Sequence, residues 1–448
     1  MDDIDQSIDS DQSTVSDQSI GSRQSIGSGQ SGDYLSARDA AGLLGVKLPT
    51  LYAYASRGLV QSVPAGRGRS RAYRRADLER LRARRDARAG HGAVAAGALR
   101  WGEPVLDSSI SAISPEQGPI YRGHPAIELA AANTPFESVA ELLWSRQTPA
   151  AGERLALRDA AWAPVEPGVP VELLGALLPP ELPPLSALSV VLPLLACRDP
   201  GRFVERPEAV LPRARALVRR LSAALSPGLS PRRVEAVLAA SSVASSVALA
   251  LGSRAGEEGV GAINRALVLV ADHELNASAF AARVAASTGA DLYACVGAAV
   301  GTFSGPRHGG AADRVEALVA EIAEPAAAER VVQERARRGE RVEGFGHPLY
   351  PDGDPRGAML LALAREIAPE SEPVRIGLAL ASAMAGQGTG GPTMDMGLVA
   401  LASALGLGRG AAVGIFAVGR CAGWVAHALE QYEAGYLVRP RARYLGPD

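Results

Sequence analysis

The feature that most constrains the fold is a series of Ala-, Leu- and Val-rich segments running from about Val234 to the C-terminus. Gly- and His-containing turns separate these segments, and almost none alternates apolar and polar residues as strands do. Helices fit at 234–252, 260–271, 276–288, 291–303, 311–322, 355–367, 373–385, 396–405 and 411–432. The sequence therefore predicts an all-α body, with a proline-dense stretch at 164–184 between helices.

Length and cysteine content exclude several classes of protein. The 448 residues correspond to two or three domains at a prior of roughly 150 residues each. Three widely spaced cysteines (Cys197, Cys295 and Cys421) exclude a disulfide framework and a cysteine-based zinc site. No apolar run approaches the ~18–20 residues of a membrane span, and the polar N-terminus is not a signal peptide. We therefore expect a cytoplasmic protein with no membrane contact.

The formal net charge of −2 conceals three unlike segments. Residues 1–33 have a net charge of −6 in a Ser-, Gln- and Gly-rich repeat, so we expect a disordered low-complexity tail. Residues 34–90 have a net charge of +9, and residues 91–448 a net charge of −5. A Gly- and Ala-rich linker at 91–102 is expected to join the basic segment to the acidic body.

The basic segment has the pattern of a helix-turn-helix. Ser36 is placed to cap a first helix that ends at Gly45, and Leu48-Pro-Thr50 starts a second helix that continues to Arg57. An arginine-rich wing from Arg67 to Arg75 and a last helix from Asp77 follow. Residues 34–90 thus resemble the winged helix-turn-helix of the MerR and excisionase group, on the strength of segments 51–59 and 70–78.

DNA is the partner that this resemblance implies, and the local positive charge agrees with it. The alternatives are a small helical module that binds protein, or one that binds nothing. The expected DNA contacts are phosphate contacts by arginines and base-edge contacts near the second helix, from Thr50, Tyr52, Arg57, Arg71, Arg74 and Arg75.

Three of the six histidines occupy Gly-rich or acidic turns between predicted helices. They are His273, His308 and His347, and an imidazole held neutral at such a turn can donate a hydrogen bond to a carbonyl. Asp395 stands among apolar neighbours, where a raised pKa would suit a general base. Arginines in the same half could bind carboxylates bidentately. Together these residues suit enolisation chemistry on a polyanionic substrate.

The C-terminal half resembles citrate synthase. The matching motifs, in the family's order, are Ala271-Asp-His-Glu-Leu-Asn-Ala-Ser278, Gly305-Pro-Arg-His-Gly-Gly310, Gly344-Phe-Gly-His347, Asp354-Pro-Arg356, Met394-Asp395, the segment 416–431 and Arg439-Pro-Arg441. The resemblance is strong over 236–445 and weaker from about Leu106.

The resemblance implies a role for each of these residues. Asp395 would remove a methyl proton of acetyl-CoA while His308 hydrogen-bonds the thioester oxygen. His347 would polarise and protonate the ketone of oxaloacetate, and citryl-CoA would then be hydrolysed to citrate and CoA. The residues that would bind the oxaloacetate carboxylates are His273, Arg356, Arg420 and Arg439, with Arg439 supplied by the partner subunit of a homodimer.

The family's fold is all-α, with a small helical domain inserted into a large one. Here the large domain is expected at 103–309 and 401–448, and the small domain at 310–400. The resemblance implies no permanently bound cofactor; acetyl-CoA is a co-substrate. A His and Asp metal site is disfavoured because these motifs lack the short spacing of metal-ligating histidines.

The sequence also departs from the family pattern near the expected site. Ala312 and Thr393 replace asparagines, Met396 stands where an aromatic residue is usual, and the run after His347 lacks basic residues. Contacts to CoA would then fall to Arg307, Arg338 or Arg341. Three readings stay open: citrate synthase, a 2-methylcitrate synthase using propionyl-CoA, or a metabolite-sensing DNA-binding regulator with a non-catalytic body.

Overall fold

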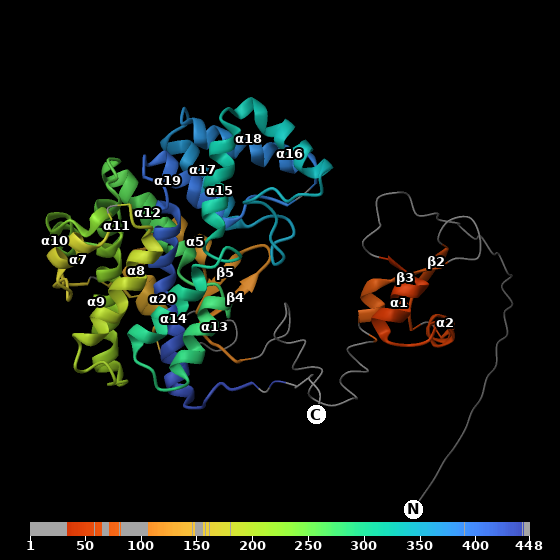
Figure 1. The fold of residues 1–448 in the computed structure, drawn as a ribbon, viewed down its shortest axis with the longest axis horizontal. Helices are drawn as coiled ribbons and strands as arrows, with labels where there is room; N and C mark the ends of the chain where they lie inside the picture. The colour runs from red at the N-terminus through yellow and green to blue at the C-terminus, as the bar shows by residue number, and fades with distance from the viewer. Residues whose placement is uncertain are drawn as a thin grey trace, which may run out of the picture. The chain divides into compact units, whose positions relative to one another are not determined.

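The computed structural model describes residues 34–57, 59–64, 71–79, 81, 106–145, 147, 156, 158–160, 162–179, 181–388, 390–440 and 442. They belong to two compact units that divide between Asp107 and Ser108 (Figure 1). The tail at 1–33 and the linker at 91–102 lie outside the described residues. Each unit has its own apolar core, and the two are treated separately.

The N-terminal unit contains β1 (Tyr34–Ser36), α1 (Ala37–Leu44), α2 (Leu48–Ser56), β2 (Ser62–Pro64) and β3 (Arg71–Arg74), then helical residues at 75–79 and 81. Its strands form an antiparallel sheet in the order β1-β3-β2. Ser36 caps α1 through the backbone N–H of Asp39, and Gly45 ends α1 with a φ of 58°. Both ends of the first helix are therefore as the sequence predicts.

The last helix of this unit begins earlier than predicted. Arg74 forms the final pair of β3, with Tyr34, so the chain leaves the sheet at Arg75 and turns directly into the helix. Arg75 thus lies on that helix and not on the wing. Arg67 and Arg69 of the predicted wing lie outside the described residues.

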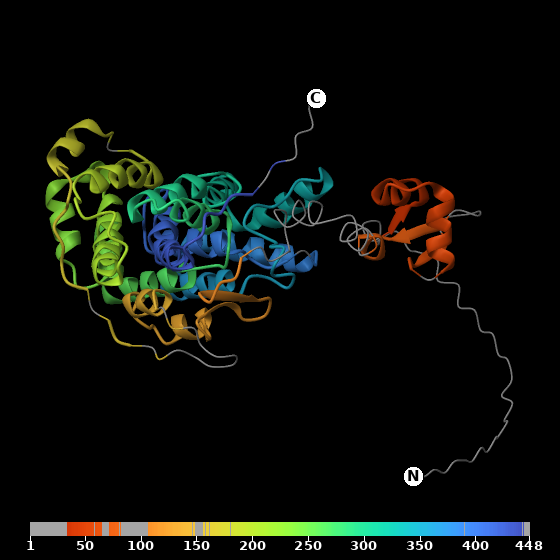
Figure 2. The ribbon, with the colours of Figure 1, turned by 90° about the horizontal axis from the view of Figure 1, so that it is seen from below.

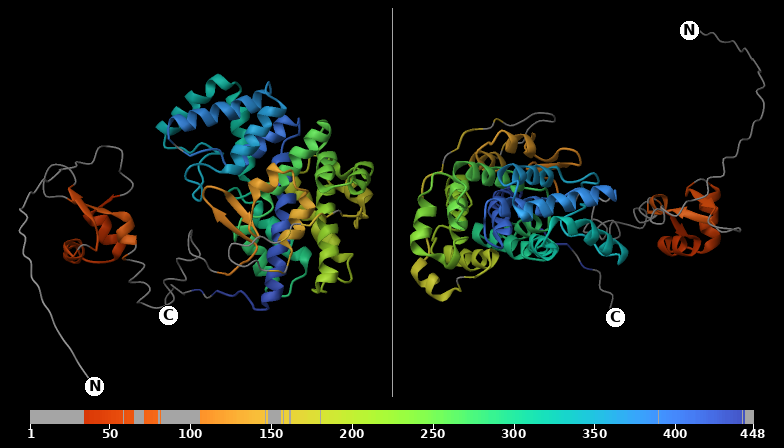
Figure 3. Two further views of the ribbon diagram at one scale, coloured as in Figure 1. Left: turned by 180° about the vertical axis from the view of Figure 1, so that it is seen from behind. Right: turned by 90° about the horizontal axis from the view of Figure 1, so that it is seen from above.

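The second unit is built from helices, as predicted. Before α20 they are α5 (Ala126–Ala131), α6 (Phe136–Leu143), α7 (Val171–Leu177), α8 (Pro184–Cys197), α9 (Pro207–Ala224), α10 (Pro231–Ala239), α11 (Val243–Leu251), α12 (Gly256–Val270), α13 (Ala277–Ala286), α14 (Leu292–Phe303), α15 (Ala311–Ile322), α16 (Ala328–Arg337), α17 (Pro355–Ile367), α18 (Glu372–Gly386) and α19 (Met394–Ala404), with 3₁₀ turns η1 (Pro227–Leu229) and η2 (Pro325–Ala327). Helices α15 to α19 gather at one end of the unit (Figures 1, 2 and 3). This lobe overlaps the small domain expected at 310–400, and the boundary itself stays a prediction.

The single helix predicted at 234–252 is two helices. The chain breaks after α10 because the Arg219 guanidinium binds the carbonyl oxygens of Leu238 and Ala240, which a continuous helix would use internally. Ser242 then caps α11 through the backbone N–H of Ser245. The capturing arginine belongs to α9, so the break depends on a tertiary contact.

A short antiparallel sheet, β4 (Ser111–Ser114), β5 (Gly118–Tyr121) and β6 (His124–Pro125), adds to the helical body. The Tyr121 hydroxyl donates to the Val268 carbonyl at 3.1 Å and accepts from the Asp272 N–H at 3.2 Å. Ser111 donates to the Asp272 carboxylate. The sheet thereby fixes the chain where it leaves α12.

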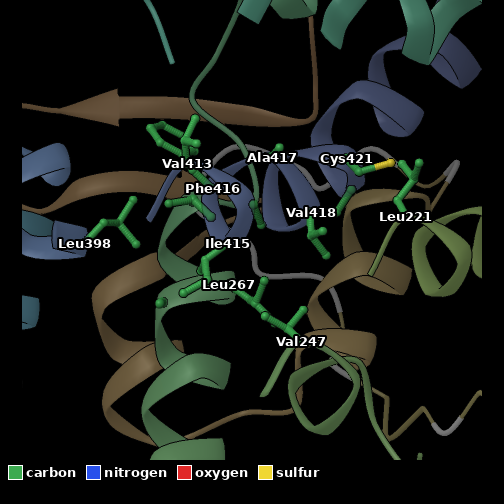
Figure 4. Close-up of a cluster of buried hydrophobic side chains, with 14 of the residues drawn as sticks. Leu221, Val247, Leu267, Leu398, Val413, Ile415, Phe416, Ala417, Val418 and Cys421 are labelled. Carbon is green, nitrogen blue, oxygen red and sulfur yellow. The ribbon is translucent and has the colours of Figure 1, made fainter. Parts of the chain in front are cut away.

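Helix α20 (Ala411–Ala434) is the central helix of the unit. Its apolar side chains pack among residues of α9, α11, α12 and α19, including Leu221, Val247, Leu267 and Leu398 (Figure 4). No membrane span was predicted, yet α20 is long enough and, with a mean hydropathy of 1.4, apolar enough to cross a membrane. Since 94% of that window is buried inside the protein, α20 is accounted for as a core helix.

Two glycines let α20 approach the end of α12 closely. A methyl group at Gly419 would overlap the Val270 side chain, and one at Gly423 would overlap the Asp272 carboxylate. The Gly423 N–H donates to the Ala271 carbonyl at 2.9 Å. This crossing places Arg420, between the two glycines, beside the segment that follows α12.

We predict that Gly423→Ala destabilises the protein strongly, because the added methyl group must displace backbone or a buried carboxylate. Overpacking of this kind costs about 1–3 kcal/mol or more. Thermal unfolding should show a lower midpoint than wild type. Gly301→Ala on α14 is the matched control: nothing lies within 4 Å of its new methyl group, and alanine favours the helix by about 0.8–1 kcal/mol. Equal midpoints for the two variants would contradict the close crossing.

Candidate active site

His273 lies in the segment between α12 and α13, just past the crossing with α20. Its ring is buried, and Nε2 lies 2.7 Å from the Tyr350 hydroxyl. Burial lowers the pKa of His273 well below its usual value, and the nearby charges of Arg356 and Arg420 lower it further. His273 is therefore a neutral imidazole that can hydrogen-bond an anionic ligand without carrying charge itself.

His308 lies in the Gly-rich turn between α14 and α15, half-buried against the Phe303 ring, with centroids 5.0 Å apart. Its Nε2 lies 2.8 Å from the Ser278 hydroxyl. Burial lowers the pKa of His308 to about 4, and the charge of Arg420 contributes in the same direction. The imidazole is thus neutral as predicted, but burial is the main cause.

His347 lies in a loop that is fixed to the start of α19. Backbone hydrogen bonds from Gly346 to Gly391 at 3.2 Å and from Thr393 to Gly344 at 2.8 Å join the two segments. The Leu349 N–H donates to His347 Nδ1 at 3.2 Å, so Nδ1 is unprotonated and the ring proton lies on Nε2. Burial lowers the pKa of His347, which keeps the ring neutral.

Asp395 stands in the first turn of α19, and its Oδ1 is buried without a hydrogen-bond partner. Burial raises the pKa of Asp395 to about 6, against the opposing charge of Arg356. A carboxylate with this pKa and with one buried oxygen unpartnered can accept a proton near neutral pH. The pKa of Asp395 is raised by its surroundings, as the apolar neighbours in the sequence predict.

Two buried arginines complete the cluster. Arg356 forms a bidentate ion pair with Asp354, with N–O distances of 3.0 and 2.7 Å. Arg420 donates from Nε to the Val270 carbonyl at 2.6 Å and lies over the Phe416 ring. Burial lowers the pKa of Arg420 to about 10, and the charge of Asp272 opposes that shift. Both guanidinium groups remain charged at neutral pH.

The structure brings most of the predicted site residues together. The His273 and His347 rings lie 5.8 Å apart, and the Arg356 guanidinium lies 5.5 Å from the centre of the Tyr350 ring that contacts both imidazoles. Arg439 lies apart: it is exposed, in the segment that runs from the end of α20 away from the helices (Figures 1 and 2). Among the described residues, no group of three or more His, Cys, Asp or Glu could hold a metal ion.

Sequence analysis missed several residues that support this cluster. Tyr350 contacts His273, His347 and Arg356, and it stands inside the motif between Gly344 and Arg356 that already drew attention. Ser278 holds His308 and also lies in a quoted motif. Trp424, which donates to Ser278, likewise lies in a matching segment, 416–431.

The departures from the family pattern have direct structural consequences. Thr393 is buried and its hydroxyl has no hydrogen-bond partner, while Ala312 and Met396 are fully buried. Of the three arginines that could meet CoA, Arg338 pairs with Glu340 at 2.7 Å. Arg307 and Arg341 are exposed.

The candidate DNA contacts lie in the N-terminal unit, and all six side chains are exposed. Arg71 donates to the side chain and carbonyl of Ser62 at 2.9 Å, and Arg74 donates to Gln61 at 3.4 Å. These bonds tie Arg71 to β2 and Arg74 to the residue just before β2.

Comparison with known families divides the chain in the same way. The family profile described as "Citrate synthase, C-terminal domain" matches residues 98–441, and the "Helix-turn-helix domain" profile matches residues 34–86. Citrate synthase 2 of Bacillus subtilis is 33% identical over 326 residues, covering 70% of this chain and 87% of that protein. A 2-methylcitrate synthase of Mycobacterium tuberculosis is 31% identical over 362 residues, covering 78% and 90%.

Solved structures agree. Citrate synthase of Thermoplasma acidophilum, in a ternary complex with carboxymethyl coenzyme A and oxaloacetate, has a TM-score of 0.64 and 27% identity, covering 77% of this chain and 94% of that one. Citrate synthase of Thermotoga maritima has a TM-score of 0.60 and 28% identity, with coverage of 77% and 94%. The predicted all-α fold and the N-terminal helix-turn-helix are both confirmed.

We predict that Asp395→Asn stabilises the protein in a pH-dependent way. Between about pH 4 and 6 the folded state holds a proton on Asp395 that the unfolded state has released, so stability falls as pH rises through this window. Above this window the buried carboxylate lowers the free energy of unfolding by up to about 3 kcal/mol. An uncharged amide at this position avoids that loss. Denaturant unfolding of both proteins from pH 4 to 8 should show a gain for the variant that grows to about pH 6. A difference that is constant with pH would contradict the raised pKa.

Proposed function

The chain belongs to the citrate synthase family, and from this membership we propose that it condenses acetyl-CoA with oxaloacetate to give citrate and free CoA. The observation that carries the proposal is the convergence of neutral imidazoles, charged arginines and one poorly solvated carboxylate. Generating an enol from a thioester requires a base close to the α-carbon and a donor at the carbonyl oxygen. Asp395 and His308 are suited to those two tasks.

The first step is enolisation. Asp395 takes a proton from the methyl carbon of acetyl-CoA, and the electron pair of that C–H bond moves into the enol. His308 donates a hydrogen bond to the thioester oxygen, where negative charge develops. A raised pKa makes Asp395 a stronger base than an exposed aspartate, and stabilisation of the enol supplies the rest of the driving force.

The second step forms the carbon–carbon bond. The enol carbon attacks the ketone carbon of oxaloacetate, the thioester carbonyl re-forms, and His347 gives its Nε2 proton to the ketone oxygen. The proton that Asp395 took from the methyl carbon then returns to the His347 ring, so both groups end in their starting protonation states. The bond from Leu349 to Nδ1 supports this role, because it leaves the proton on Nε2. His273, Arg356 and Arg420 bind the oxaloacetate carboxylates, and Arg439 joins them from the partner subunit of a homodimer. Water then hydrolyses the thioester of citryl-CoA to citrate and CoA.

The acyl group that the site accepts is the finer part of the proposal. Acetyl-CoA is the proposed co-substrate. The alternative is propionyl-CoA, which would give 2-methylcitrate, and the similarity to a 2-methylcitrate synthase supports it. Arg307 and Arg341 are the exposed cations assigned here to the phosphates of CoA.

We predict that the purified protein releases CoA from acetyl-CoA only when oxaloacetate is present. Asp395→Ala should lower kcat by about 10²- to 10⁴-fold, as expected for loss of a general base, with the free thiol followed spectroscopically. Glu366→Ala, which removes an exposed carboxylate from α17, is the control and should keep full activity. No release from acetyl-CoA or propionyl-CoA would exclude the enzyme and leave the sensing regulator.

The N-terminal unit supports a second function, binding of DNA. Its family match, its net charge of +9 over residues 34–90 and the exposure of all six candidate contacts favour this partner. Thr50, Tyr52 and Arg57 would lie near base edges, and Arg71, Arg74 and Arg75 at phosphates.

We predict that replacing Arg71, Arg74 and Arg75 by alanine weakens DNA binding about equally for all sequences. Each lost phosphate contact should lower the slope of log K against log salt by about 0.9. Fluorescence anisotropy with a labelled duplex at several salt concentrations measures both quantities. Arg337→Ala, which removes an exposed arginine from α16, is the control. Unchanged affinity and slope for the triple variant would contradict the assigned contacts.

A further inference from the structure

Trp424 contacts both groups that hold the His308 ring. It lies on α20, fully buried, and its indole Nε1–H donates to the Ser278 hydroxyl at 2.9 Å. The same hydroxyl lies 2.8 Å from His308 Nε2. One contact path therefore runs from the indole through a single oxygen atom to the imidazole.

A second path runs through an aromatic ring. Trp424 packs edge-on against Phe303, with centroids 5.6 Å apart, and Phe303 packs edge-on against His308 at 5.0 Å. Gly309 has no side chain, and a methyl group there would overlap the Phe303 ring. The imidazole thus contacts Ser278 on one side and Phe303 on another, and Trp424 contacts both of these residues.

Hydrogen-bond accounting shows why the indole N–H matters. Ser278 has one hydroxyl proton and two neighbours that can accept it, Asn276 Oδ1 at 2.7 Å and His308 Nε2. If His308 is to donate from Nδ1, its Nε2 must accept, and Ser278 is the donor placed to supply that bond. The Trp424 N–H can only donate, so it occupies an acceptor position of the Ser278 oxygen whichever way the proton points.

We propose that Trp424 is a positioning residue for His308, fixing the orientation of the imidazole through Ser278 and Phe303. This proposal rests on the role of His308 in the proposed function. Trp424 is fully buried and would act only through these two side chains.

The other described tryptophans do not share this arrangement. Trp144 donates its indole N–H to the Ala422 carbonyl at 2.9 Å, and Trp162 donates to Glu141 at 3.0 Å. Trp144 is likewise buried and likewise hydrogen-bonded to α20. It therefore provides a control: the same substitution at Trp144 removes an indole N–H that donates to Ala422, which lies on α20 two positions before Trp424.

A double-mutant cycle tests the path through Ser278. Trp424→Phe keeps an aromatic ring and removes the N–H; we expect kcat to fall about 10- to 100-fold, as for a misoriented catalytic group, with KM for oxaloacetate within about twofold of wild type. In the Ser278→Ala background the same substitution should change kcat by less than about twofold, because its contact is already absent. Trp144→Phe should leave kcat unchanged. Multiplicative effects of Trp424→Phe and Ser278→Ala, or an unchanged kcat for Trp424→Phe, would overturn the proposal.

A second readout does not need turnover. The sequence contains six histidines, few enough for their ring nitrogens to be resolved by ¹⁵N NMR of imidazole-labelled protein. The His308 ring nitrogens should shift in Trp424→Phe and in Phe303→Leu, and should not move in Trp144→Phe. Unchanged shifts in both site variants would overturn the proposal even in an active enzyme. If the wild-type protein releases no CoA but the His308 resonances still shift in the two variants, the proposed function is excluded and the positioning of His308 by Trp424 stands.

Discussion

The close crossing of α12 and α20 is the contact on which the rest of the catalytic unit depends. Gly419 and Gly423 bring the backbones together, and the residue between them, Arg420, donates to the last carbonyl of α12. Everything after that carbonyl then has a fixed position: Asp272 against Gly423, and His273 one residue later. The long central helix therefore does more than fill the core. Its crossing with α12 fixes the position of the segment that carries Asp272 and His273.

Burial accounts for most of the site's electrostatics. The same desolvation that keeps His273, His308 and His347 neutral raises the pKa of Asp395. The cost of burying charge is offset locally by partners within the protein: Arg356 forms an ion pair with Asp354, and Ser111 donates a hydrogen bond to Asp272. The Arg420 side chain donates to a backbone carbonyl, lies over the Phe416 ring and is stabilised by the charge of Asp272; a dianionic substrate would bring a further negative charge to it.

Local signals predicted the caps of α1, the turns that carry the three histidines and most of the helices after Val234, because glycine turns and helical periodicity depend on adjacent residues. They did not predict α16 at Ala328–Arg337, and they joined α10 and α11 into one helix. Contacts between distant residues were not predictable in this way. Tyr350 reaches His273 across 77 positions, Trp424 reaches Ser278 across 146, and the break after α10 depends on an arginine of α9. Arg439 was assigned through the family alone, and this chain by itself leaves it outside the cluster.

The two units differ in net charge, and they also have separate apolar cores. The N-terminal unit packs around Leu44, Leu51, Tyr73 and Leu78, and none of these belongs to the core of the catalytic unit. Two cores that share no residue, among those described, can each fold without the other's side chains. Substrate binding could then influence DNA binding only through a surface contact or through assembly of the protein, not through repacking of a common interior. A metabolite-responsive regulator and an enzyme that merely carries a DNA-binding module therefore differ in whether such a coupling exists, not in the core of either unit.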